Sequence, residues 1–183
     1  GTLVLNADDE GSASMAERDG VGVERLSLVY LALEPDHELL KSHLAKGGRG
    51  YFRRDGWLVE SNGGHEHRIV HVSSIPATFD GAADHQVVNC LAAAAAGRAM
   101  GRSRDEVANA LGTFDGVAHN PGRASLFSLG DGYVMVDYGH NTEAFRATGT
   151  LARRWHGELI GIVGVPGDRE DAIIEEAAVA TVT

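Results

Sequence analysis

The residues best suited to chemistry lie between Asn120 and Asn141, in the segment NPGRASLFSLGDGYVMVDYGHN. A Pro-Gly pair precedes Arg123, whose planar and permanently charged guanidinium can bind a phosphate group through two hydrogen bonds. Asp137 and His140 follow a short apolar run, and polar side chains just past the end of a strand tend to face a crevice. The aspartate can accept hydrogen bonds from a ribose diol, and the imidazole can stack on a nucleotide. A solvated turn and a solvated linker arginine are the alternatives from the residues alone.

Two further segments carry polar groups that suit a small anionic ligand. Gln86 and Asn89 lie in the first turns of an alanine-rich stretch, where an amide can both donate to and accept from an adenine base, or else serve as a cap or a solvated residue. Farther along, GIVGVPGDR spans residues 161–169 and runs from an apolar segment into a loop. It lacks the G-x-G-x-x-G spacing of dinucleotide-binding loops, and Pro166 removes a backbone donor.

The hydrophobic pattern predicts the elements that must position these residues. Apolar and polar residues alternate on both sides of Asp55-Gly56, which predicts a β-hairpin. The pair Ser103 and Glu106 predicts a helix that begins with a capping box. Strands are expected at residues 2–5, 23–33, 50–53, 57–60, 67–73, 124–129, 133–136 and 159–165. Helices are expected at residues 12–18, 36–46, 84–100, 103–111 and 143–155, and from about residue 171. The pattern indicates an α/β fold with one parallel strand, a small antiparallel sheet and a βαβ section after Pro121.

Composition excludes several classes of protein. The net charge of −10 argues against a nucleic-acid partner, because phosphate backbones require an excess of Lys and Arg. No apolar run approaches the roughly 20 residues of a membrane helix. A single cysteine, Cys90, forms no internal disulfide, which fits a reducing cytoplasm, and its alanine-rich setting favours a packed core thiol. His65, His67 and His71 lack an acidic or thiol partner that would complete a zinc site, so we expect no metal among these residues.

Several of these motifs, taken in order, resemble the Mur ligase family. They are NADD at residues 6–9, the alanine-rich helix after Asn89, NPGR at 120–123, VDYGHN at 136–141 and GVPGDR at 164–169. Within that family these motifs are most similar to those of the C-terminal ligase half of cyanophycin synthetases. Gln86 stands where the family has an Asn, Gly139 stands where Ala is usual, and Thr142 stands where Pro is common.

The resemblance implies a role for each candidate residue. Arg123 would reach the phosphates of ATP as the catalytic arginine, and Asp137 would contact the ribose. Other residues implied to bind the nucleotide are Gln86, Asn89, Tyr138 and His140. Asp168 and Arg169 would lie near the incoming amine substrate. The implied ligands are ATP with Mg²⁺, a carboxylate substrate and an amino acid such as arginine.

The resemblance also implies a domain organisation. Residues 1–121 would form the C-terminal part of a P-loop-type central domain, and residues 122–183 would begin a Rossmann-like C-terminal domain. The 183 residues contain no G-x-x-x-x-G-K-[ST] phosphate loop, so the loop and the Mg²⁺ ligands are expected in an upstream part of the same polypeptide. Alternatives are a peptidoglycan-precursor or folylpolyglutamate ligase and, from another class, a non-catalytic nucleotide-binding module. The oligomeric state stays open, a homo-oligomer included.

Overall fold

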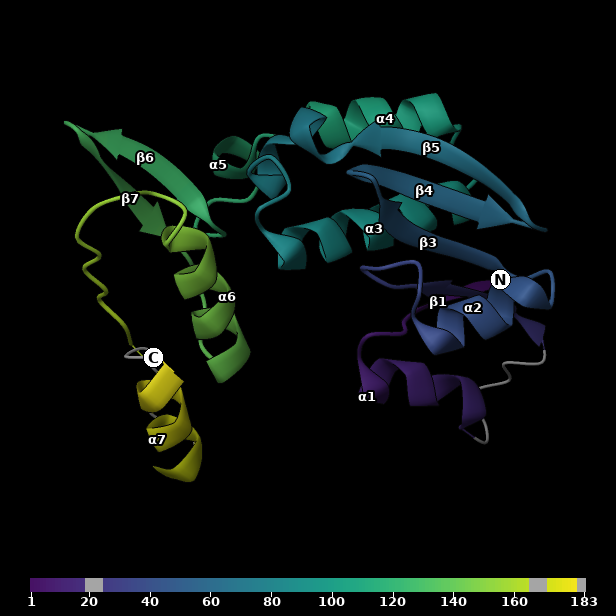
Figure 1. The fold of residues 1–183 in the computed structure, drawn as a ribbon, viewed down its shortest axis with the longest axis horizontal. Coiled ribbons are helices and arrows are strands. Elements are labelled where there is room, and N and C mark those ends of the chain that lie inside the picture. Colours follow the sequence, from purple (N-terminus) through teal and green to yellow (C-terminus); the bar gives the residue numbers. More distant parts are fainter. Residues whose placement is uncertain (19–24, 165–170, 181–183) are drawn as a thin grey trace. The chain divides into compact units, whose positions relative to one another are not determined.

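The computed structural model describes residues 1–18, 25–164 and 171–180 of the chain (Figure 1). The chain divides into two compact units, Gly1–Phe114 and Asp115–Thr183. Each unit contains a β-sheet of its own, with five strands in the first unit and two in the second. The expected α/β class is confirmed at this level.

The sheet of the first unit is mixed. Its strands lie in the order β1-β2-β3-β4-β5, with parallel pairing from β1 to β3 and antiparallel pairing from β3 to β5. The antiparallel strands were expected as a small sheet beside a parallel strand, but β3 pairs with β2 as well, so both parts are continuous. The strands are β1 (Thr2–Asn6), β2 (Ser27–Leu31), β3 (Arg49–Arg54), β4 (Trp57–Asn62) and β5 (His65–His71).

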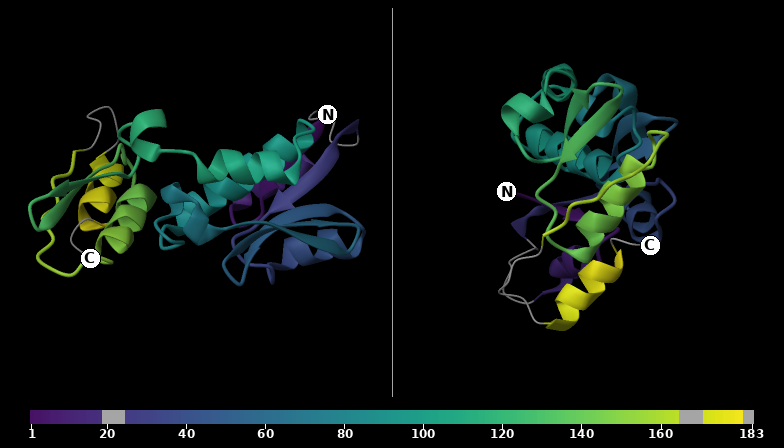
Figure 2. Two further views of the ribbon diagram at one scale, coloured as in Figure 1. Left: turned by 90° about the horizontal axis from the view of Figure 1, so that it is seen from above. Right: turned by 90° about the vertical axis from the view of Figure 1, so that its left-hand side faces the viewer.

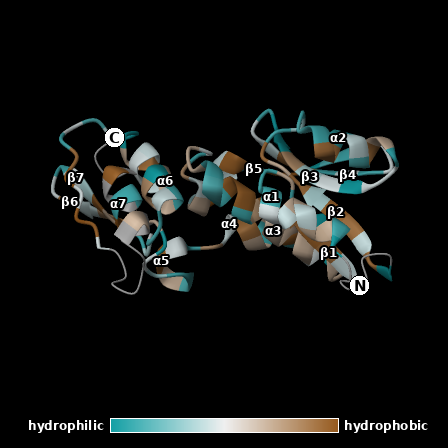
Figure 3. Ribbon diagram, turned by 90° about the horizontal axis from the view of Figure 1, so that it is seen from below, coloured by the Kyte–Doolittle hydropathy of each residue, from teal (hydrophilic) through white to brown (hydrophobic). Residues whose placement is uncertain are grey.

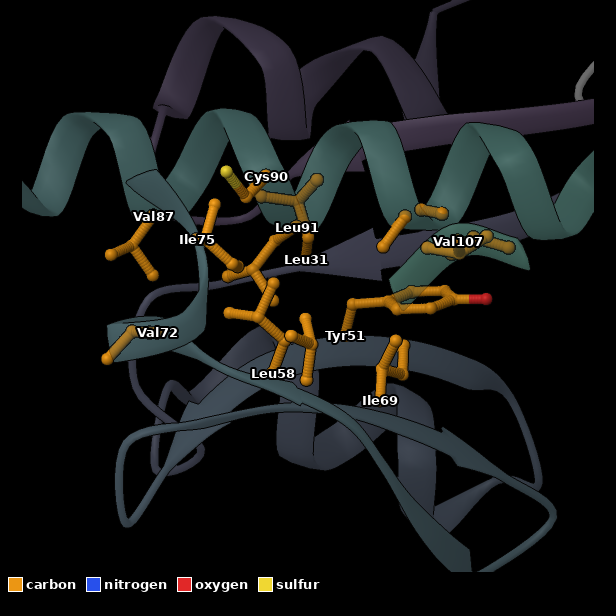
Figure 4. Packing of buried hydrophobic residues seen from close by; sticks show 14 residues of the cluster. Leu31, Tyr51, Leu58, Ile69, Val72, Ile75, Val87, Cys90, Leu91 and Val107 are labelled. Carbon is orange, nitrogen blue, oxygen red and sulfur yellow. The ribbon is translucent and has the colours of Figure 1, made fainter. Parts of the chain in front are cut away.

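Helices cover both faces of this sheet. Figure 2 shows α3 and α4 on one face and α2 on the other. The core beneath α3 contains Leu31, Tyr51, Leu58, Ile75 and Leu91, and Figure 4 shows these side chains between the helix and the sheet. The helical segments are α1 (Glu10–Ala13), η1 (Ser14–Glu17), α2 (Glu38–Ala45), η3 (Val72–Ser74), η4 (Pro76–Thr78), α3 (Asp84–Ala99) and α4 (Arg104–Gly112).

Gly50 determines how closely α2 packs on the sheet. A Cβ atom at this position of β3 would lie 2.5 Å from Leu40 Cδ1 and 3.1 Å from Leu44 Cδ2, both on α2. The backbone carbonyl of Tyr30 would lie 3.3 Å away on the other side. The missing side chain therefore lets Leu40 reach the strand backbone and become fully buried.

Local sequence signals predicted the turns and caps of the first unit well. Asp55 and Gly56 both have positive φ, at 51° and 76°, as a two-residue hairpin turn of the primed type requires. Ser103 and Glu106 form both halves of the predicted capping box. The segment expected as one helix at residues 12–18 is instead α1 followed by η1, because Asp9 caps a helix that begins at Glu10. The strand expected at residues 23–33 is shorter, Ser27–Leu31.

The described residues of the second unit form a hairpin and three helices. Strands β6 (Ser125–Leu129) and β7 (Gly132–Val136) lie close to the predicted ranges, and they pair antiparallel. Tyr133 contacts the ring of Trp155 at 5.7 Å between centroids, and Leu151 of α6 is 1% exposed. Figure 3 colours the ribbon of the hairpin by hydropathy, and several of its hydrophobic side chains, among them Phe127, Leu129 and Val134, are nevertheless exposed. The helices are α5 (Gly116–His119), α6 (Thr142–Ala152) and α7 (Asp171–Ala180).

The buried strand predicted at residues 159–165 is wrong for residues 159–164, since Val165 lies outside the described residues. Residues 159–164 contain no strand, and Ile160 and Ile162 are 78% and 97% exposed. An apolar run becomes a buried strand only where a neighbouring strand satisfies its backbone groups. Within the described part of the second unit, β6 and β7 pair only with each other.

The boundary between the compact units lies at Phe114–Asp115, seven residues before the predicted boundary at Pro121-Gly122. Asp115 accepts hydrogen bonds from the backbone N–H groups of Val117 and Ala118 and so caps α5, which contacts β6. This places residues 115–121 with the second unit. Over the residues that the structure describes, no helix is both long and apolar enough to cross a membrane.

Candidate functional site

The Pro-Gly-Arg turn is fixed to the end of β7. Gly122 and Ala124 have positive φ angles of 79° and 47°, so the backbone around Arg123 turns sharply. The Tyr138 N–H donates to the Gly122 carbonyl at 2.8 Å, and the Gly122 N–H donates to Ser125 Oγ at 2.9 Å. The first bond joins two segments that are separate in sequence and places Arg123 beside the polar residues that follow β7, and the second is a local bond within the turn.

Arg123 rests on an aromatic ring. Its Cζ lies 4.9 Å from the centroid of the exposed Tyr138 ring, and the Tyr138 and His140 rings are 5.5 Å apart. In the described ranges, no carboxylate pairs with Arg123, whereas Arg53, Arg98 and Arg104 are all paired. A guanidinium that lies over an aromatic ring and has no carboxylate partner keeps N–H donors available for an anion.

Asp137 is half-buried at the end of β7, as predicted. Its Oδ2 accepts a hydrogen bond from the Ala124 N–H at 2.8 Å. Its Oδ1 accepts none from the part of the chain that the structure describes, so this oxygen can accept hydrogen bonds from a ligand such as a ribose diol. Gly139 lies against Oδ1: a Cβ there would approach this oxygen and Ala144 Cβ at 3.1 Å each.

Three residues lie at or just before the start of α6. Asn141 caps α6 by accepting from the Ala144 N–H at 2.8 Å. His140 Nδ1 lies 3.2 Å from the Tyr138 carbonyl oxygen, a distance that allows the protonated nitrogen to donate to that oxygen. Thr142, which stands where the family often has Pro, is buried at the first position of α6.

Gln86 and Asn89 belong to the first unit. Asn89 Nδ2 donates to Gln86 Oε1 at 3.2 Å, so the two amides form one pair near the start of α3. Arg53 holds this end of the helix close to the end of β3, because its guanidinium bonds both to Asp84 of α3, at 2.7 Å, and to Glu34. The amide pair therefore lies near the edge formed by the carboxyl ends of the parallel strands, where open α/β sheets bind ligands.

The NADD segment, residues 6–9, lies at the same edge of the sheet, where the parallel strands end. Asp8 Oδ2 accepts from the Leu33 N–H at 2.6 Å and so joins the chain after β1 to the chain after β2. Asp9 caps α1 by accepting from the Ser12 N–H, also at 2.6 Å. Both carboxylates bind backbone groups, which supports a structural reading of this motif.

Sequence reasoning missed a buried polar cluster beneath α3 and α4. Glu60 is 1% exposed and accepts from Tyr51 Oη at 2.9 Å, Arg104 Nε at 2.7 Å and Arg98 Nε at 3.3 Å. Burial favours a raised pKa for Glu60, but these donors outweigh it and the pKa is lowered. Burial, together with the Glu60 carboxylate, raises the pKa of Tyr51. Leu58 and Glu60 are two residues apart on β4, so their side chains lie on the same face of the sheet. This spacing is a signal that could have placed the Glu60 carboxylate inside.

Cys90 and His71 have structural surroundings. Cys90 is buried in the core, and burial raises the pKa of its thiol to about 11. His71 Nδ1 lies 2.8 Å from Ser73 Oγ, and the His71 ring meets Trp57 edge to face. No group of three or more His, Cys, Asp or Glu side chains gathers as a metal site among the described residues.

The predicted site residues therefore form two groups. Arg123, Asp137, Tyr138 and His140 come together in the second unit, and Gln86 and Asn89 pair in the first. Asp168 and Arg169 lie outside the described residues.

Comparison with known proteins identifies relatives of the chain. It is 39% identical over 173 residues to a cyanophycin synthetase of Trichormus variabilis, which covers 93% of this chain. The chain is related to one segment of cyanophycin synthetases. Similar enzymes of Nostoc sp. and Synechocystis sp. are 38% and 34% identical over 93% and 96% of the chain. The resemblance to cyanophycin synthetases drawn from the motifs is thus confirmed.

The match covers only part of each relative. The chain spans 19% to 20% of the length of these cyanophycin synthetases. No family model matches the chain.

Proposed function

We propose that this chain is a segment of an ATP-dependent ligase that joins a carboxylate to an amine. The observation that carries the proposal is its 39% identity, over 93% of its length, to a cyanophycin synthetase. The geometry of the second unit supports the same reading. Arg123 has no carboxylate partner among the described residues and lies over the Tyr138 ring. Asp137 is bonded through Oδ2 to the backbone of Ala124, the residue after Arg123, and its Oδ1 accepts no hydrogen bond from the described residues.

The reaction proposed for the complete enzyme has two steps. A carboxylate oxygen of the first substrate attacks the γ-phosphorus of ATP, which gives an acyl phosphate and ADP. The nitrogen of an amine then attacks the carbonyl carbon, phosphate leaves, and the amine loses a proton as the amide forms. Dividing a difficult condensation in this way replaces one high barrier with two lower ones. By resemblance, the amine is arginine and the carboxylate is an aspartate side chain of a growing polymer.

Each site residue has a proposed role in this reaction. Gln86 and Asn89 would hydrogen-bond the adenine, Asp137 would accept from the ribose hydroxyls, and Tyr138 and His140 would line the nucleotide pocket. Arg123 would stabilise the negative charge that develops on the transferred phosphoryl group. Asp168 and Arg169 are proposed to face the amine substrate.

The described residues do not make a Mg²⁺ site, since no cluster of three or more potential ligands occurs among them. The proposal therefore assigns Mg²⁺ and the phosphate loop to an upstream part of the polypeptide. The first compact unit, Gly1–Phe114, would complete the central domain, and the second, Asp115–Thr183, would begin the C-terminal domain.

A non-catalytic nucleotide-binding module is the second candidate, favoured by the absence of a phosphate loop from these 183 residues. Within the ligase class, peptidoglycan-precursor and folylpolyglutamate ligases are the alternatives.

The deciding experiment uses the complete reading frame that contains this chain. We expect it to encode an upstream G-x-x-x-x-G-K-[ST] loop, and its product to incorporate labelled arginine into an aspartate polymer with release of ADP. The 183-residue chain alone should not hydrolyse ATP above the rate of its Arg123→Ala variant. A reading frame without the loop, or a complete protein that ligates no amine, would contradict the ligase proposal and favour a non-catalytic nucleotide-binding module.

A further inference from the structure

The contact between Arg123 and Tyr138 suggests a role for the tyrosine beyond lining a nucleotide pocket. The Arg123 Cζ lies 4.9 Å from the Tyr138 ring centroid, and the ring is 64% exposed. We propose that Tyr138 is a positioning residue, whose ring holds the Arg123 guanidinium ready for a phosphoryl group. This inference rests on the proposed function and deepens it.

The contact with the ring leaves hydrogen-bond donors of the guanidinium available. A cation–π contact attracts the positive charge to the face of the ring, whereas an anion such as a phosphate is bound by the N–H groups of the guanidinium. Within the described ranges, Arg123 has no carboxylate partner that would occupy those donors. An arginine held in this way loses less side-chain freedom when it binds an anion than one that moves freely in solvent.

The backbone fixes the ring relative to the arginine. The Tyr138 N–H bonds to the Gly122 carbonyl at 2.8 Å, and Asp137 Oδ2 accepts from the Ala124 N–H at 2.8 Å. The residues on both sides of Arg123 are thus tied to Tyr138 and to its neighbour. The backbone segments that carry the ring and the guanidinium are therefore hydrogen-bonded to each other.

The positioning role differs measurably from a contact between Tyr138 and the nucleotide. Loss of a nucleotide contact raises the KM for ATP, whereas loss of an arginine that acts on developing charge lowers kcat. Tyr138→Leu removes the aromatic ring, and Tyr138→Phe keeps it. Tyr133→Leu is the matched control, because Tyr133 is an exposed tyrosine, 54% accessible, of the same unit with no role in the proposed site.

The first test needs no nucleotide. In NMR spectra of the 183-residue chain, we expect the Arg123 Hδ protons to be shifted upfield by the ring, and we would assign them with Arg123→Lys. The upfield shift should persist in Tyr138→Phe and Tyr133→Leu and disappear in Tyr138→Leu. Arg123 resonances that are the same in Tyr138→Leu and the unsubstituted chain would overturn the stack and the proposal with it.

The second test measures ATP-dependent ligation by the complete reading frame. We expect Tyr138→Leu to lower kcat by about fivefold, the factor that an exposed cation–π contact supplies, with the KM for ATP changed by less than about twofold. Tyr138→Phe and Tyr133→Leu should retain kcat. In an Arg123→Ala background, Tyr138→Leu should have no further effect on kcat.

The outcomes separate the two proposals. A rise in KM alone, an increase in kcat, or additive effects of Tyr138→Leu and Arg123→Ala on kcat would overturn the positioning role and leave the ligase intact. A complete enzyme that never consumes ATP would overturn the proposed function, and the catalytic purpose of the stack with it, even if NMR confirms the stack.

Discussion

Glu60→Gln should strongly destabilise the first unit. The carboxylate is 1% exposed and accepts hydrogen bonds from two arginines and a tyrosine, Arg98, Arg104 and Tyr51. Glutamine keeps the volume of the side chain but lacks the negative charge. Its amide NH₂ group, a hydrogen-bond donor, would also face the donor groups of Arg98, Arg104 and Tyr51. Hydrogen bonds to charged groups contribute about 1.5–3 kcal/mol each, against about 1 kcal/mol for neutral ones.

The expected loss follows from these contacts. Weakening two charge-assisted bonds and leaving two cations without a counter-charge would cost up to about 5 kcal/mol in a fully buried site. Arg98 and Arg104 are 22% and 35% exposed, so water recovers part of this cost. We therefore expect the free energy of unfolding to fall by about 2–4 kcal/mol.

The dependence on pH tests the electrostatic origin of this loss. The folded state lowers the pKa of Glu60, so its stabilisation is fully present above the unfolded pKa of about 4.3 and disappears as the pH falls through the folded pKa. The difference between the unsubstituted chain and Glu60→Gln should be constant from about pH 5 to pH 7 and should shrink below about pH 4.

Urea unfolding followed by Trp57 fluorescence is a suitable assay. The chain has two tryptophans, and a Trp155→Phe background makes the signal specific to the first unit. Glu66→Gln is the matched control, because Glu66 also pairs with an arginine, Arg54, but is 41% exposed. The control should lose less than about 0.5 kcal/mol. Equal losses for Glu60→Gln and Glu66→Gln, or a difference that does not shrink at all between pH 7 and pH 3, would refute the reasoning.

Three further predictions concern packing, reactivity and the site. Gly50→Ala should destabilise the first unit by about 1–3 kcal/mol in urea unfolding because its Cβ overlaps α2, whereas Gly149→Ala, in open space on α6, should stabilise the second unit by about 0.5–1 kcal/mol. Cys90, with its pKa raised to about 11, should react with iodoacetamide at pH 8 at least about 100-fold more slowly in the native chain than in urea; equal rates would show an accessible thiolate. Asp137→Ala should weaken ATP binding about tenfold or more by calorimetry on the complete enzyme, while Asp131→Ala, in the exposed hairpin turn, should not, and unchanged affinity in the former would remove Asp137 from the site.

Elements whose determinants are local could be predicted from the sequence. The Asp55-Gly56 turn and the capping box of Ser103 and Glu106 depend on residues within one turn of chain, and both are present as predicted. Glu60 shows the limit of this reasoning. Its inward position follows because Glu60 shares a face of β4 with the buried Leu58, two residues earlier. Its partners Arg98 and Arg104 lie 38 and 44 residues away, and only the tertiary fold brings them together.

The failed strand shows the same dependence on distant partners. Residues 159–163 are as apolar as the residues of β1, yet β1 pairs with β2 along its whole length, whereas residues 159–164 pair with no strand in the described part of the chain. For the candidate site, the sequence located Asp137 at a strand end, but the stack of Arg123 on Tyr138 required the turn geometry around Gly122.

The hydrogen bonds around the Pro-Gly-Arg turn have a consequence for the placement of Arg123. They tie Gly122 and Ala124 to Ser125, Asp137 and Tyr138 within the second unit. The backbone of Arg123 therefore keeps its place beside the end of β7, and the side-chain rotamer alone decides where the guanidinium reaches within this unit.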